Sequence, residues 1–160
     1  MSLAEKLYKT LLAQNMKLAT AESCTGGMVA AAVTDIAGSS AVFDRGFVTY
    51  SNCAKTEMLG VPADLIARVG AVSREVAIAM AMGALDNSNA DIAVAITGVA
   101  GPAGGSPEKP IGLVHFSVAR QGETAIHNVQ KFGNLSRAEI REKATAHAFT
   151  LVLSQLGLEP

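Results

Sequence analysis

The stretch that decides the fold reads Ala21-Glu22-Ser23-Cys24-Thr25-Gly26-Gly27. An apolar run over residues 17–21 precedes it and predicts a strand, and the Ala/Val-rich residues 28–36 after it predict a helix. A strand-to-helix turn of small residues directs backbone N–H groups toward one point, where an oxyanion or a phosphate can bind. Close packing of strand and helix would also account for its two glycines. The turn carries three possible nucleophiles, namely Ser23, Cys24 and Thr25.

Hydrophobic periodicity along the rest of the chain predicts an α/β fold, a three-layer α/β/α sandwich with a mixed, mostly parallel central sheet. Residues 91–97 are apolar over the length of one strand, which is typical of a strand buried on both faces. The length of 160 residues predicts a single domain over residues 1–160. Helices are expected over residues 3–15, 28–36, 62–69, 76–85 and 136–156, and a further short helix, capped by Asn52, is expected through Lys55 to Leu59. Strands are expected over residues 17–21, 42–50, 91–97, 111–120 and 124–132.

Composition excludes several classes of function. Hydrophobic residues make up 49% of the chain and aromatic residues only 4%, so an aromatic groove for single-stranded nucleic acid is not expected. The net charge is -1 and no basic run is present, which argues against nucleic-acid binding. The two cysteines lack metal-ligand spacing, and no apolar run approaches the roughly 18 residues of a membrane span. We expect a cytoplasmic protein with no membrane contact.

A second candidate region is the loop over residues 98–112, which contains five glycines and three prolines and follows the buried strand. Loops at the end of a central strand are where α/β proteins place ligands. The chain contains no Gly-x-Gly and no P-loop, so the usual nucleotide fingerprints are absent. Loops this long are usually functional or mobile, although a plain surface loop remains an alternative.

Lys55 follows the predicted strand over residues 42–50, where most lysines are solvated surface charges. Burial would lower its pKa enough for the amine to act as a base toward a serine. The histidines are scattered and have neither metal-ligand spacing nor an obvious acidic partner, which disfavours a Ser-His-Asp triad or a metal site. They are His115, His127 and His147.

Two arginines, Arg137 and Arg141, are four residues apart in the last predicted helix and therefore share one face. Such a pair suits contacts to a phosphate or carboxylate. Ordinary surface ion pairs with Glu139 and Glu142 are the alternative.

Several motifs occur in one order and together closely resemble the C-terminal domain of the competence/damage-inducible CinA family, over about residues 3–156. The sequence departs from the family pattern near Phe132, where Asp is missing and the spacing to Arg137 is one residue longer. This departure favours Arg141 over Arg137 as a binding residue. The matching motifs are residues 21–27, Gly38-Ser39-Ser40, residues 48–52 with Lys55, Gly70-Ala71-Val72-Ser73, residues 97–102 and Lys109-Pro110-Ile111-Gly112.

The resemblance implies hydrolysis of the carboxamide of nicotinamide mononucleotide to nicotinate mononucleotide and ammonia, in pyridine nucleotide recycling. It also implies no metal, no cofactor, and a homodimer or higher homo-oligomer. A catalytically inactive nucleotide-binding or interaction module is the alternative, since it would use the same loops and arginines.

Amide hydrolysis requires a nucleophile, a base, an acid for the leaving ammonia and donors to the oxyanion. We expect Ser23 as nucleophile and Lys55 as base and later acid, with Tyr50 orienting the proton and Thr97 donating to the oxyanion. Cys24 and Ser40 are rival nucleophiles. The expected binding residues are Cys24, Thr25, Gly26, Gly27, Ser40, Gly98, Ala100, Gly101, Gly105, Arg137 and Arg141.

Overall fold

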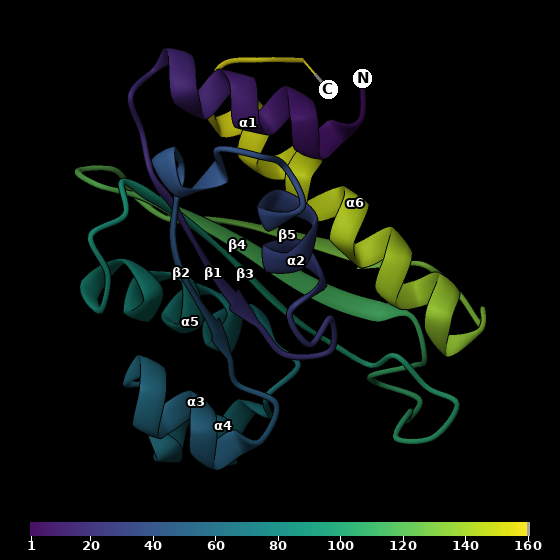
Figure 1. The fold of residues 1–160 in the computed structure, drawn as a ribbon. Coiled ribbons are helices and arrows are strands. Elements are labelled where there is room, and N and C mark those ends of the chain that lie inside the picture. Colours follow the sequence, from purple (N-terminus) through teal and green to yellow (C-terminus); the bar gives the residue numbers. More distant parts are fainter. Residues whose placement is uncertain (160) are drawn as a thin grey trace.

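The computed structural model describes residues 1–159 and places one five-stranded sheet between two layers of helices (Figure 1). The helices are α1 (Leu3–Ala13), α2 (Met28–Thr34), α3 (Asn52–Leu59), α4 (Ala63–Val69), α5 (Arg74–Asp86) and α6 (Arg137–Gln155), with a 3-10 turn η1 (Ser39–Ala41). The strands are β1 (Leu18–Glu22), β2 (Phe43–Val48), β3 (Ile92–Gly98), β4 (Leu113–Arg120) and β5 (Ile126–Lys131).

The strand order is β2-β1-β3-β4-β5. Strand β1 pairs in parallel with β2 and β3, whereas β4 pairs antiparallel with both β3 and β5. Only β4 therefore runs against the other four, which confirms the predicted α/β class with a mixed, mostly parallel sheet.

Helix ends follow the local capping chemistry. Ser136 Oγ accepts a hydrogen bond from the N–H of Glu139 and begins α6, as its sequence position predicts. Helix α3 begins at Asn52, the residue predicted as its cap, because Ser51 is the cap instead and its Oγ accepts from the N–H of Ala54. This early start places Lys55 in the first turns of α3.

The two faces of the sheet carry different cores. Large aliphatic side chains fill the space under α1, α2 and α6, while alanines dominate the face under α5. Small side chains let helices approach closely, and α3 approaches α5 so closely that a Cβ atom on Gly83 would overlap the carbonyl oxygen of Leu59. Packing against α5 therefore fixes the position of α3 relative to the sheet.

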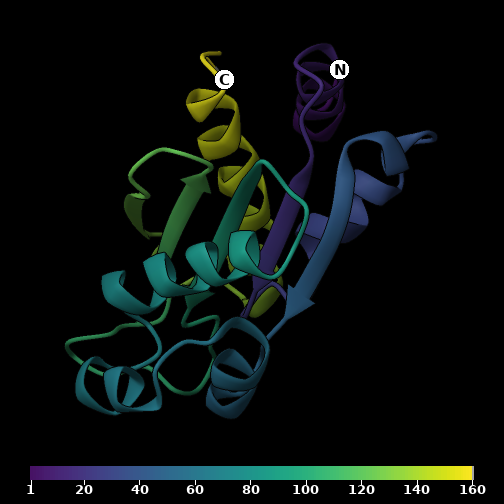
Figure 2. The ribbon, with the colours of Figure 1, turned by 90° about the vertical axis from the view of Figure 1, so that its left-hand side faces the viewer.

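The carboxyl ends of the parallel strands point toward one end of the molecule. Figure 2 shows α3 and α4 gathered at that end, with α5 crossing the face of the sheet above them. Both termini lie at the opposite end (Figure 1). No helix within residues 1–159 has the length and hydropathy needed to cross a membrane.

Candidate active site

Three sequence-predicted site residues meet at the carboxyl ends of the parallel strands. Ser23 directly follows β1, Thr97 is the last but one residue of β3, and Tyr50 follows β2. Because Glu22 pairs with Ile96 on β3 and with Val48 on β2, the segments that follow these strands begin at the same level of the sheet. Parallel pairing thus explains why residues far apart in the chain surround one space.

That space is a cavity of about 500 Å³, within the usual size range of small-molecule sites. Its walls come from the turn after β1, from α3, from the segment before α5, from the glycine loop after β3 and from the start of α6. The lining residues are Ser23, Cys24, Tyr50, Asn52, Lys55, Ala71, Val72, Thr97, Gly98, Val99, Ala100, Gly101, Ala103, Gly104 and Arg137.

Lys55 is buried beside the predicted nucleophile, with only 1% of its surface exposed. Its Nζ donates to Ser23 Oγ at 3.0 Å and to the carbonyl oxygens of Thr49 at 2.8 Å and Tyr50 at 3.5 Å. Burial lowers the pKa of the Lys55 amine below its ordinary value. Among residues 1–159 no carboxylate forms a salt bridge with Lys55 that would oppose this effect. The alternative interpretation from the sequence, that Lys55 is a solvated surface charge, is therefore wrong.

The contacts of Lys55 suit a neutral amine. A neutral amine would donate its two N–H groups to the Thr49 and Tyr50 carbonyls, and would then accept the Ser23 hydroxyl proton at the 3.0 Å contact instead of donating to it. In this state Lys55 can take the proton of Ser23, as a general base must.

The rival nucleophile Cys24 has a different environment. Its thiol is 5% exposed, and burial raises its pKa to about 11, so it stays protonated near neutral pH. The thiolate is the reactive form of cysteine. The geometry therefore favours Ser23 over Cys24.

Glu22 is a buried residue of the turn to which the sequence analysis assigned no role. Its carboxylate is 1% exposed and accepts from the hydroxyl of Thr25 at 2.7 Å and from the N–H groups of Val29 at 2.9 Å and Ala30 at 3.1 Å. Helix α2 has Gly27 at its N-cap and no capping bond from that residue, so Glu22 supplies the cap. The signal available in the sequence was an acidic residue at the end of the predicted strand, followed a few residues later by a helix whose N-cap is a glycine with no side chain to cap it.

The two arginines of α6 have separate roles. Arg137 lines the cavity, where it donates to the carbonyl of Gly101 at 2.8 Å and to the hydroxyl of Tyr50 at 2.6 Å. Arg141 instead donates to the carbonyls of Cys24 at 3.0 Å and Thr25 at 3.3 Å, and it does not line the cavity. The structure therefore places Arg137, and not the sequence-favoured Arg141, at the cavity that Ser23 and Lys55 line.

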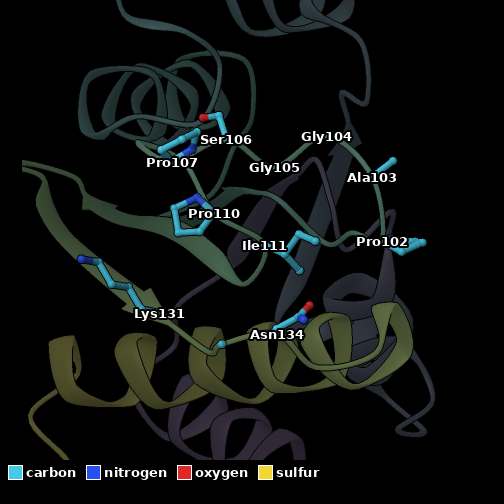
Figure 3. Close-up of a pocket in the computed structure, with 11 residues that line it drawn as sticks. Pro102, Ala103, Gly104, Gly105, Ser106, Pro107, Pro110, Ile111, Lys131 and Asn134 are labelled. Atoms are coloured by element: carbon cyan, nitrogen blue, oxygen red, sulfur yellow. The ribbon is translucent and has the colours of Figure 1, made fainter.

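Other predicted residues lie outside the cavity. Ser40 precedes β2, which runs parallel to β1, so Ser40 lies at the amino end of the sheet, opposite Ser23. Gly105 lines a second cavity of about 640 Å³ with Ile111 and Asn134 (Figure 3). Within the turn, Ser23 and Cys24 line the cavity of about 500 Å³, whereas Thr25, Gly26 and Gly27 do not.

The histidines also lie away from the cavity lining. His115 and His127 contact each other at 2.8 Å, and His147 contacts Asn128 Oδ1 at 2.8 Å. Over residues 1–159, no three His, Cys, Asp or Glu residues cluster as metal ligands.

The comparisons with known proteins agree on one family. The model of the CinA C-terminal domain matches residues 1–156. The nicotinamide-nucleotide amidohydrolase PncC of Escherichia coli (strain K12) is 49% identical over 155 residues, which are 97% of this chain and 93% of that protein. A CinA-like protein of Mycolicibacterium vanbaalenii is 57% identical over 136 residues, but the match covers only 32% of its length.

Solved structures show the same fold. The competence/damage inducible protein CihA from Agrobacterium tumefaciens superposes with a TM-score of 0.94 at 47% identity, covering 98% of this chain and 94% of that chain. A CinA superfamily protein from Escherichia coli gives 0.91 at 35% identity, covering 96% and 88%.

Proposed function

This chain belongs to the family of the CinA C-terminal domain, and on that premise we propose that it is a nicotinamide-nucleotide amidohydrolase. It converts nicotinamide mononucleotide to nicotinate mononucleotide and ammonia, a step of pyridine nucleotide recycling. The observation that carries this proposal is the hydrogen bond between buried Lys55 and Ser23 at the wall of the cavity.

In the proposed reaction the Lys55 amine takes the proton of Ser23 while Oγ attacks the carboxamide carbon. The Lys55 ammonium then gives this proton to the leaving nitrogen, which departs as ammonia and leaves an ester on Ser23. Water attacks the ester with Lys55 again as base, and the proton returns to Ser23 Oγ as nicotinate mononucleotide forms. The proton balance is therefore closed by one base, without metal or cofactor.

Backbone N–H groups of the turn are the proposed oxyanion donors. Those of Gly26 and Met28 already donate to carbonyls of the turn, whereas in the described chain the N–H groups of Cys24 and Thr25 donate to no other residue. Cys24 lines the cavity, and the N–H after a nucleophile commonly serves this purpose. One such donor lowers the barrier by about 3 kcal/mol. Thr97 is a second candidate, although its hydroxyl now donates to the carbonyl of Ala71 at 2.9 Å.

Arg137 is the proposed phosphate ligand. Its guanidinium spans the cavity between Gly101 and Tyr50, and a planar guanidinium suits bidentate binding of phosphate oxygens. Tyr50 is 60% exposed and bonded to Arg137, so its part is to hold that arginine at the mouth of the cavity. The loop residues Gly98 and Ala100 line the same cavity as Ser23 and Arg137.

The test is release of ammonia from nicotinamide mononucleotide by the purified protein, with Ser23→Ala as control. We expect ammonia and nicotinate mononucleotide in equal amounts from the wild type, and no turnover by Ser23→Ala. A protein whose melting temperature rises with the nucleotide but which releases no ammonia would be a binding module instead. Light scattering tests the accompanying proposal of a homodimer or higher homo-oligomer, and cell fractionation tests the proposed cytoplasmic location.

A further inference from the structure

Two side chains that do not line the cavity, Glu22 and Arg141, form hydrogen bonds with the turn at residues 21–27. We propose that both are positioning residues for the amidohydrolase reaction: Arg141 orients the peptide groups of the turn, and Glu22 fixes the turn to α2. Arg141 would thereby act on turnover and not on the substrate phosphate. The inference rests on the proposed function, and it assigns substrate binding to Arg137 and positioning of the nucleophile to Arg141.

The carbonyls of Ser23, Cys24 and Thr25 all accept hydrogen bonds. The Ser23 carbonyl accepts from the N–H of Gly26 at 3.0 Å, the Cys24 carbonyl accepts from Arg141, and the Thr25 carbonyl accepts from both Arg141 and the N–H of Met28 at 3.1 Å. A trans peptide is planar, so its N–H points opposite to its C=O. Holding the Ser23 and Cys24 carbonyls therefore sets the directions of the Cys24 and Thr25 N–H groups, neither of which donates to another residue in the described chain.

The guanidinium of Arg141 fits closely against the turn. A Cβ atom on Gly26 would lie 3.3 Å from Arg141 Nη2, and Gly26 has a positive φ of 59°. The guanidinium stays charged at all relevant pH values, so it also polarises the Cys24–Thr25 peptide toward an acceptor of its N–H. Its position thus favours negative charge developing beside Ser23.

Glu22 acts from the other side of the turn. Its carboxylate binds the Thr25 hydroxyl and two amides of α2, so these amides are no longer available to an anionic substrate. The buried carboxylate fixes the distance between Ser23 and the start of α2. With these amides occupied and the Lys55 amine neutral, Arg137 is the permanently charged side chain that lines the cavity within the described residues.

Arg137 provides the matched comparison for Arg141. The two residues are one helical turn apart, about 6 Å along α6, yet their guanidinium groups bond to different parts of the site. Lys143 follows on the same helix and is exposed, so Lys143→Met is a control for loss of a cation.

The experiment measures kcat and KM for nicotinamide mononucleotide and for nicotinamide riboside, which lacks the phosphate. Arg141→Met should lower kcat roughly 10²-fold for both substrates while KM changes little, because a misplaced nucleophile affects the reaction and not the phosphate. Arg141→Lys should recover part of the loss, since an ammonium reaches one carbonyl but not two. Glu22→Gln should also lower kcat, Arg137→Met should raise KM for the nucleotide only, and Lys143→Met should change neither parameter.

A second readout does not need turnover. Hydrogen exchange at the amides of residues 24–30 should be faster in Arg141→Met and Glu22→Gln, while calorimetry should find wild-type affinity for nicotinamide mononucleotide in Arg141→Met. A wild type that releases no ammonia overturns the proposed function. In that case hydrogen exchange at residues 24–30 and calorimetric affinity for the nucleotide still test whether Glu22 and Arg141 position the turn. An Arg141→Met protein that loses nucleotide affinity, or that keeps both wild-type exchange and wild-type kcat, overturns the inference; if it does not fold, Arg141→Lys decides by the same criteria.

Discussion

Replacing Lys55 by Met tests whether a buried neutral amine drives the reaction. The substitution removes the only side chain bonded to Ser23 Oγ in the described chain, at 3.0 Å, and keeps a similar apolar volume at a position that is 1% exposed. General-base catalysis contributes roughly 10²–10⁴-fold, so the barrier should rise by about 3 to 5 kcal/mol. Lys55→Arg should be equally inactive, because a guanidinium cannot lose its proton.

Lys55→Met should also change how the free energy of unfolding depends on pH. Burial lowers the folded-state pKa of Lys55 below its ordinary value of 10.5, so between the two values the unfolded chain binds one more proton. The stability of the wild type relative to Lys55→Met should rise with pH across this window, by at most about 1.4 kcal/mol per pH unit. The penalty for burying the charge is fully present below the folded pKa and disappears toward pH 10.5.

Two measurements check this prediction. Steady-state ammonia release gives kcat, and kcat/KM of the wild type should rise with pH as the amine forms. Urea unfolding of both proteins at several pH values gives the stability difference. Lys55→Met that keeps more than a tenth of wild-type kcat, or a stability difference that does not vary with pH, would refute the neutral-amine mechanism.

Three further perturbations have expected outcomes. Cys24→Ala should keep most of its ammonia-releasing activity, because the buried thiol has its pKa raised to about 11; abolished turnover would point to Cys24 as nucleophile. Gly83→Ala should lower the free energy of unfolding by about 1 to 3 kcal/mol in urea titrations, because its Cβ meets the Leu59 carbonyl, whereas exposed Met82→Ala should change it by under about 0.5 kcal/mol. Burial lowers the pKa of His147, as it does for the other two histidines, so the unfolded chain binds more protons just below pH 6.5 and stability should fall as the pH drops through that window. The urea midpoint of His147→Phe should depend less steeply on pH there.

The sequence predicted most of the elements, and the structure brings the four expected catalytic residues to one cavity, which Ser23, Tyr50, Lys55 and Thr97 line. Strand β3 and the turn at residues 21–27 follow from an apolar run and from small residues between two periodic segments, which are local patterns. The burial of Lys55 could not be predicted in this way, because it depends on how closely α3 packs on α5 at Gly83. Ser40 was expected near Ser23 but lies at the opposite end of the sheet. The order of elements held this information, because Ser40 precedes β2 while Ser23 follows the parallel strand β1.

The arginines show why helical spacing alone could not assign their functions. A spacing of four residues places Arg137 and Arg141 on one face, and that face does point toward the site. However, one turn of helix is long enough to move a guanidinium from the cavity to the wall behind the nucleophile. The chain can therefore use one helix for two tasks, with its first residue facing the substrate and the next turn supporting Ser23 through the carbonyls of Cys24 and Thr25. Any shift of α6 along its axis should consequently change nucleotide affinity and turnover together, whereas substitutions at either arginine should separate them.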